Sequence, residues 1–107
     1  MSTRLEQLSS LLASSPNDTF LLFAVAKEHE KHGNESEALA FYLRLQETDP
    51  NYTGLYYHLG KLYEKQQDFG QAIQIYKQGI EICKQAGDRH AMSELAGALL
   101  NLEDDEG

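Results

Sequence analysis

The four histidines of this sequence suggest a metal site, and its one cysteine suggests a nucleophile. His29 and His32 are three residues apart, so on a helix they would share a metal only if a third ligand approached them. No cysteine lies near them, and His58 and His90 are isolated. We therefore favour a buried, hydrogen-bonded His29 over a metal ligand.

The single cysteine, Cys83, excludes an internal disulfide bond and a cysteine-based zinc site. It falls on the apolar side of a predicted helix without a histidine placed as its base, which is typical of a small core residue. The sequence also has no glycine-rich phosphate loop and no serine nucleophile elbow. We expect no enzymatic activity, no catalytic residue and no cofactor.

The chain of 107 residues is acidic, with 9 Lys and Arg against 17 Asp and Glu and a formal net charge of −8. Four acids form the run 103–106, within an acidic tail at 103–107 that we expect to be solvated and frayed. Nucleic acids and anionic membranes attract clustered Lys and Arg, so neither is expected as a partner. No apolar leader and no membrane-spanning stretch occurs, which favours the cytoplasm.

Apolar residues recur at helical spacing along almost the whole chain, and turn residues divide them into helices. The predicted helices are 3–14, 18–32, 35–48, 52–66, 69–85 and 89–102. Asn34 followed by Glu37, and Asp68 followed by Gln71, have the form of capping boxes. The inward stripes of the first and last helices are predicted to be Leu5, Leu8, Leu11 and Leu12, and Met92, Leu95, Ala96, Leu99 and Leu102.

Two of the helix pairs repeat each other after 34 residues, since Ala38 aligns with Ala72 and Tyr42 with Tyr76. The second copy, counted from Thr53, has at positions 4, 7, 8, 11, 20, 24 and 27 the residues Tyr56, Leu59, Gly60, Tyr63, Ala72, Tyr76 and Gly79. This pattern resembles the tetratricopeptide repeat. The first copy departs from it at His29, where Tyr is usual, and at Leu45, where Ala is usual.

The resemblance implies an all-α fold, a right-handed superhelical solenoid of antiparallel helix hairpins with about six helices. We expect a single domain, 1–107, with repeats at 19–52 and 53–86. The segment 3–14 resembles the second half of a repeat, because the 34-residue count places Leu8 at position 24 and Leu11 at position 27. It would cap one end, and the helix 89–102, which fits the first-helix positions after a two-residue insertion, would cap the other.

The resemblance also implies which side chains line the concave face, because positions 2, 5, 9, 12 and 13 of each first helix point into it. The predicted peptide-binding residues are Phe20, Phe23, Lys27, Glu30 and Lys31 in the first repeat, and Tyr57, Lys61, Glu64 and Lys65 in the second. The last helix would add His90, Ser93 and Gly97. Aromatic rings beside lysines favour apolar contact combined with a carboxylate or another acidic group. Solvated, paired lysines and aromatic rings that pack across the groove are the alternative interpretation.

Family members that hold the C-terminal carboxylate of chaperones carry Lys and Asn where this chain has Phe23 and Lys27, so that clamp is not expected here. The predicted function is a non-enzymatic scaffold or adaptor that binds a peptide or helix of a protein partner in its concave groove. The partner expected is a protein or peptide with an acidic or C-terminal carboxylate group. The alternative is a structural protein that acts through self-association, as a homo-oligomer, of its solenoid ends or its convex face. The protein is expected to be a monomer or a weak homodimer. Interface candidates are Tyr52, Tyr56, Ile75, Leu99, Leu100 and Leu102.

Overall fold

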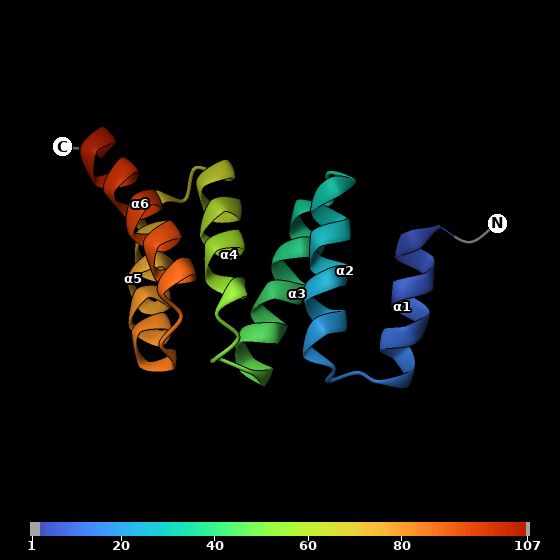
Figure 1. Cartoon of the computed structure of the whole chain (residues 1–107). Coiled ribbons are helices and arrows are strands. Elements are labelled where there is room, and N and C mark those ends of the chain that lie inside the picture. Colours follow the sequence, from blue (N-terminus) through green and yellow to red (C-terminus); the bar gives the residue numbers. More distant parts are fainter. Residues whose placement is uncertain (1–2, 107) are drawn as a thin grey trace. The chain divides into compact units, whose positions relative to one another are not determined.

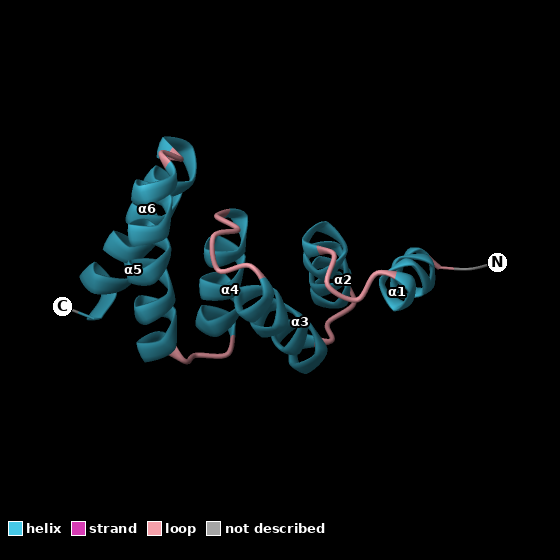
Figure 2. Ribbon diagram, turned by 90° about the horizontal axis from the view of Figure 1, so that it is seen from below, coloured by secondary structure: helices cyan, strands magenta, loops and turns pink. Residues whose placement is uncertain are grey.

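The computed structural model describes residues 3–106, and within them the secondary structure consists of helices joined by short loops (Figures 1 and 2). The helices are α1 (Arg4–Ser14), α2 (Thr19–Lys31), α3 (Glu35–Thr48), α4 (Gly54–Lys65), α5 (Phe69–Ala86) and α6 (Arg89–Glu106). The expected all-α helical repeat fold is confirmed, and the bounds of the first five helices agree with the predicted ranges within two residues. The last helix continues to Glu106, through acidic residues that we expected to lie in a frayed tail.

The helices form two compact units, one ending at Tyr52 and one beginning at Thr53. This boundary coincides with the boundary between the two predicted repeats. The first unit contains α1, α2 and α3, and the second contains α4, α5 and α6.

Short polar side chains begin most of the helices. Asp18 accepts a hydrogen bond from the backbone of Leu21 at 3.0 Å, and Asp68 accepts one from Gln71 at 3.3 Å. The capping box predicted at Asn34 is wrong, because the Asn34 side chain makes no bond to its helix and lies 3.3 Å from Nδ1 of His29 instead. The helix after Asn34 therefore begins without a side-chain cap.

In the first unit, α2 packs between α1 and α3 and contributes the fully buried Leu22, Val25 and Ala26. The Tyr42 side chain of α3 is fully buried, and its hydroxyl donates a hydrogen bond to the Glu30 carboxylate of α2. A helix of α1's length is marginal alone, so it depends on the burial of Leu8 and Leu12. Leu11, predicted to face inward, is 56% exposed because α1 packs against one neighbouring helix rather than two.

In the second unit, large and small residues interlock between α4 and α5. A Cβ atom added to Gly60 would overlap the Tyr76 ring, and one added to Gly79 would overlap the Tyr56 side chain. These glycines therefore allow the two helices to approach closely enough to bury both rings. The Tyr76 hydroxyl donates to Glu64 of α4, at the same repeat positions as Tyr42 and Glu30 in the first unit.

Helix α6 packs on α5 and, over a smaller area, on α4. Its buried residues are Leu95, Ala98 and Leu102. The inward stripe predicted for this helix is wrong at Ala96, which is exposed, because the stripe is rotated toward Ala98. Burial of Tyr56, Ile75 and Leu102 inside this unit also removes them as candidates for a self-association interface.

Replacing Gly79 by alanine should lower the free energy of unfolding by about 1 to 3 kcal/mol, because the new methyl group has no room beside Tyr56 and Leu95. Urea denaturation followed by circular dichroism measures the change. The matched control is Gly97→Ala, since a Cβ atom at Gly97 would meet nothing within 4 Å. This control should gain about 0.5 to 1 kcal/mol from the better helix former. Equal effects at the two glycines would contradict the interlocking described above.

Candidate functional site

The second unit has a surface groove between α4 and α6. It encloses about 240 Å³ and is lined by Tyr57, Lys61, Ser93, Glu94, Gly97, Ala98 and Asn101. The predicted site residues Tyr57 and Lys61 therefore lie together, opposite Ser93 and Gly97 of the last helix. Small residues on α6 leave the space open, because no atom beyond the adjoining residues and backbone of α6 lies within 4 Å of the position of a Cβ at Gly97.

The α4 wall of this groove combines an aromatic face with a charge network. The Nζ atom of Lys61 lies 5.6 Å from the centre of the Tyr57 ring and 3.5 Å from a carboxylate oxygen of Glu64. Glu64 in turn accepts the hydrogen bond from Tyr76. Lys61 is therefore held between a ring and a carboxylate while it stays partly open to solvent.

The α6 wall is polar. Ser93 and Asn101 are exposed and lie on either side of Gly97 along the helix, at four-residue spacing that places all three on one face. His90, expected on this face, pairs with Glu94 at 3.6 Å and is not among the residues that line the groove. Asn101 was missed from the sequence, although the spacing of Ser93 and Gly97 pointed to it.

In the first unit, the predicted site residues Lys27, Glu30 and Lys31 of α2 line an open hollow of about 430 Å³ together with Glu28. The Phe23 ring is half-buried and packs in tilted geometry against Tyr42 and Tyr52, with ring centres 6.3 and 5.4 Å away. These contacts give Phe23 a packing role whether or not a ligand also touches it.

Four of the nine predicted peptide-binding residues lie outside these hollows, namely Phe20, Phe23, Glu64 and Lys65. Phe23 and Glu64 have the packing and pairing contacts given above. Phe20 is 63% exposed at the start of α2, and Lys65 is exposed in the last turn of α4. Neither is among the residues that line the groove of the second unit or the hollow on α2.

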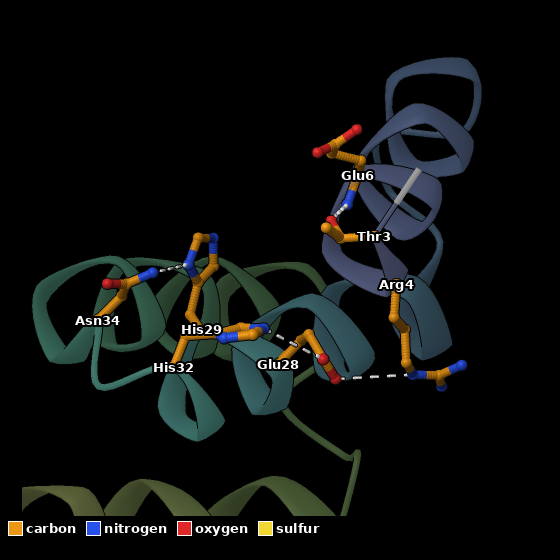
Figure 3. Close-up of polar contacts among 7 residues, drawn as sticks. All are labelled: Thr3, Arg4, Glu6, Glu28, His29, His32 and Asn34. Atoms are coloured by element: carbon orange, nitrogen blue, oxygen red, sulfur yellow. Dashed lines mark hydrogen bonds and ion pairs between the residues drawn. The ribbon is translucent and has the colours of Figure 1, made fainter. Parts of the chain in front are cut away.

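A charged cluster between α1 and α2 was not predicted from the sequence (Figure 3). Glu28 is only 8% exposed, and its carboxylate lies 3.6 Å from Nε of Arg4 and 3.4 Å from Nε2 of His32. A glutamate three residues after the buried Val25 was the available signal, because it falls near the apolar side of α2. Arg4 reaches across from α1, so the cluster joins the two helices.

His29 and Cys83, which were considered as a metal ligand and a nucleophile, pack inside the helix pairs. The His29 ring is half-buried, stacks on Phe41 with ring centres 5.5 Å apart, and contacts the Asn34 amide. Burial, and secondarily the charge of Asp88, raise the pKa of the Cys83 thiol, which keeps it protonated and poorly nucleophilic. Across the described residues, no three His, Cys, Asp or Glu side chains gather where they could hold a metal ion.

None of the helices in the described part of the chain has the length and apolar character needed to cross a membrane.

The chain is similar to known proteins that contain the same kind of repeat. Residues 53–85 match the tetratricopeptide repeat family. A TPR repeat-containing protein of Pseudomonas aeruginosa is 28% identical over 99 residues, which are 92% of this chain and 94% of that protein.

Solved structures extend the match. A tetratricopeptide repeat domain protein of Salinibacter ruber, known from a crystal structure, is 49% identical, with a TM-score of 0.78 over 81% of this chain and 97% of its own. A protein of Bordetella parapertussis, known from a solution structure, is 26% identical, with a TM-score of 0.86 over 99% of this chain and 92% of its own. The chain belongs to the tetratricopeptide repeat family, whose fold is that of a protein–protein interaction module.

Proposed function

We propose that this protein is a non-enzymatic adaptor that binds a peptide segment of a partner protein in the groove between α4 and α6. The observation that carries the proposal is the composition of this groove, in which an aromatic ring and a lysine face small and polar residues of α6. Recognition sites for peptides combine an apolar contact with a few placed polar groups. The absence of a basic cluster on this acidic chain favours a protein partner over nucleic acid, and we place the protein in the cytoplasm.

Apolar contact in this proposal comes from Tyr57 and from the space at Gly97. A side chain of the bound peptide enters above Gly97 and packs against the Tyr57 ring. Ser93 and Asn101 lie on either side of this point and hydrogen-bond to the peptide backbone. Because both helices are already ordered, little conformational entropy of the protein is lost on binding.

Lys61 provides the contact with an acidic group of the peptide. Its ion pair with Glu64 is partly exposed, and pairs of that kind contribute only about 0 to 1 kcal/mol. Glu64 keeps the hydrogen bond from Tyr76 when Lys61 turns toward the peptide, so its carboxylate is not left unsatisfied. Lys61 can therefore exchange Glu64 for a carboxylate of the ligand at small cost.

The α2 face of the first unit repeats part of this arrangement. Lys27 and Lys31 flank Glu30, which accepts the hydrogen bond from Tyr42 as Glu64 does from Tyr76. In our proposal Lys27 and Lys31 are further contacts for acidic groups of a partner. Phe23 adds apolar area beside them.

Filling the groove at Gly97 tests the proposal most cleanly. Gly97→Leu places a side chain in open space and improves helix propensity, so the protein should remain folded. Peptides selected on the wild-type protein from a display library of the source proteome should lose about tenfold or more in affinity for this variant, measured by fluorescence polarisation.

The matched control is Gly97→Ala, which adds one methyl group and should leave affinity within about threefold of wild type. If the selected peptides bind Gly97→Leu as tightly as the wild type, or if no peptide is selected, the groove is not the binding site.

Removing the Tyr57 ring should weaken the same peptides by about 1 to 3 kcal/mol without unfolding the protein, because the ring is half-buried rather than part of the core. Lys61→Ala should weaken only those peptides that carry a carboxylate at the contact. Isothermal titration measures both variants, with Lys77→Ala, an exposed lysine of α5, as the control for net charge. Equal losses for Lys61→Ala and Lys77→Ala would assign the effect to general charge.

A further inference from the structure

Helix α6 has a second apolar face that the other helices of the second unit cover only in part. Its members are Met92, Ala96, Leu99 and Leu100, of which Ala96 and Leu100 are exposed, the latter at 58%. The corresponding face of α4 lies 36 residues earlier, which is one repeat of 34 residues plus the two-residue insertion. It consists of Tyr56, Gly60, Tyr63 and Glu64. There α5 covers Tyr56 and Gly60 completely. The face on α6 is thus the one against which a second helix of a repeat packs.

The contacts of α5 with α4 define what such a helix must carry. Tyr76 lies over Gly60 and donates to Glu64, and Gly79 lies against Tyr56. On α6 the same places are held by Ala96, Leu100 and Met92. Leu100 has no acceptor for a tyrosine hydroxyl, so the residue placed over it must be apolar and without a polar group.

Helix α1 fulfils this requirement. Leu8 lies two repeats of 34 residues before Tyr76, and Leu11 lies the same distance before Gly79. The tyrosines of α3 and α5 thus face glutamates, whereas α1 carries at this position Leu8, which packing on α2 leaves only 6% exposed. Leu11 is 56% exposed, so α1 retains apolar surface after packing on α2.

Two features at the ends of the α6 face also fit α1. Beside Met92, the turn between α5 and α6 contains a hollow of about 270 Å³ that is lined in part by Cys83 and Met92 and lies where Leu11 would dock. The exposed Glu103 and Asp104 lie near the other end of α6. An antiparallel α1 brings Arg4, whose side chain is 64% exposed, toward these acids.

We propose that α1 of one copy docks antiparallel on the Met92, Ala96, Leu99 and Leu100 face of α6 in a second copy. The contact completes a helix hairpin between two chains. It uses different surfaces on the two copies, so it is heterologous and leaves a free α1 and a free α6 at the ends of every assembly. Assembly therefore grows with concentration instead of stopping at a dimer, and it weakens with salt because of the Arg4 contact.

Sedimentation velocity from micromolar to millimolar protein tests this proposal with two single variants. Leu11→Glu blocks the α1 surface and Leu100→Glu blocks the α6 surface, and both substitutions are at exposed positions that leave the core intact. The wild type should show an average mass that rises continuously with concentration, and each variant alone should associate at least about tenfold more weakly. An equimolar mixture should form a heterodimer that does not grow, because each variant keeps the surface that the other lacks.

Ser9→Glu, at an exposed position on another face of α1, is the control for added charge and should assemble like the wild type. A monomeric wild type at millimolar concentration would overturn the proposal. So would assembly of Leu11→Glu with loss only in Leu100→Glu, which would show α6 pairing with itself. A mixture of the two variants that fails to form the heterodimer would exclude the α1 contact.

Discussion

A buried tyrosine in each unit, with its hydroxyl bonded to a glutamate on the preceding helix, is the constraint on which the helix pairing depends. Tyr42 and Tyr76 are fully buried and stand at the same repeat position. Their hydroxyls have no access to water, so each needs a partner inside the protein, and Glu30 and Glu64 supply it. A hydrogen bond to a charged acceptor contributes about 1.5 to 3 kcal/mol, and it also fixes the register between the two helices.

The same glutamates connect the core to the proposed binding surface. Glu64 holds Lys61 on the groove between α4 and α6, while Glu30 lies between Lys27 and Lys31 on α2. A residue predicted as a ligand contact is thus also part of the scaffold. Substituting Glu64 would disturb packing and binding together, which is why Gly97 and Tyr57 are the sharper sites for separating the two roles.

The repeat pattern predicted the helices well because the spacing of apolar residues and turn residues is local information. Side-chain detail depended on tertiary contacts that a pattern does not contain. Tyr56 of the second unit stands where the first unit has the smaller Leu22, and Gly79 stands where it has the larger Leu45. Gly79 lies against Tyr56, so the loss of volume at one position makes room for the gain at the other. The sequence shows each change, but only the packed helices show that the two compensate.

The candidate site was likewise predictable where it depends on repeat position and not where it depends on tertiary contacts. Tyr57, Lys61, Ser93 and Gly97 were placed on one surface by repeat position alone, and they do line one groove. The buried Glu28 was missed, because its burial results from the docking of α1 and from Arg4 on a different helix. Leu11 was assigned to the core because helical spacing identifies an apolar face without showing which parts of it a neighbour covers.

The tyrosine–glutamate pairing can be tested directly by measuring how the free energy of unfolding depends on pH in the alkaline range. Burial, together with the hydrogen bond and charge of the paired glutamate, raises the pKa of Tyr42 and Tyr76 well above the ordinary value for tyrosine. Below about pH 10 both the folded and the unfolded chain keep these phenolic protons; above it only the unfolded chain releases them, so folding stability falls as pH rises.

Urea denaturation between pH 8 and pH 11 should therefore show a wild-type free energy of unfolding that drops above about pH 10, by up to about 1.4 kcal/mol per pH unit for each of the two tyrosines. The Tyr42→Phe, Tyr76→Phe double variant should start lower and fall less steeply. Parallel pH dependence in the two proteins would show that these hydroxyls are not held protonated against the glutamates, and would contradict the account.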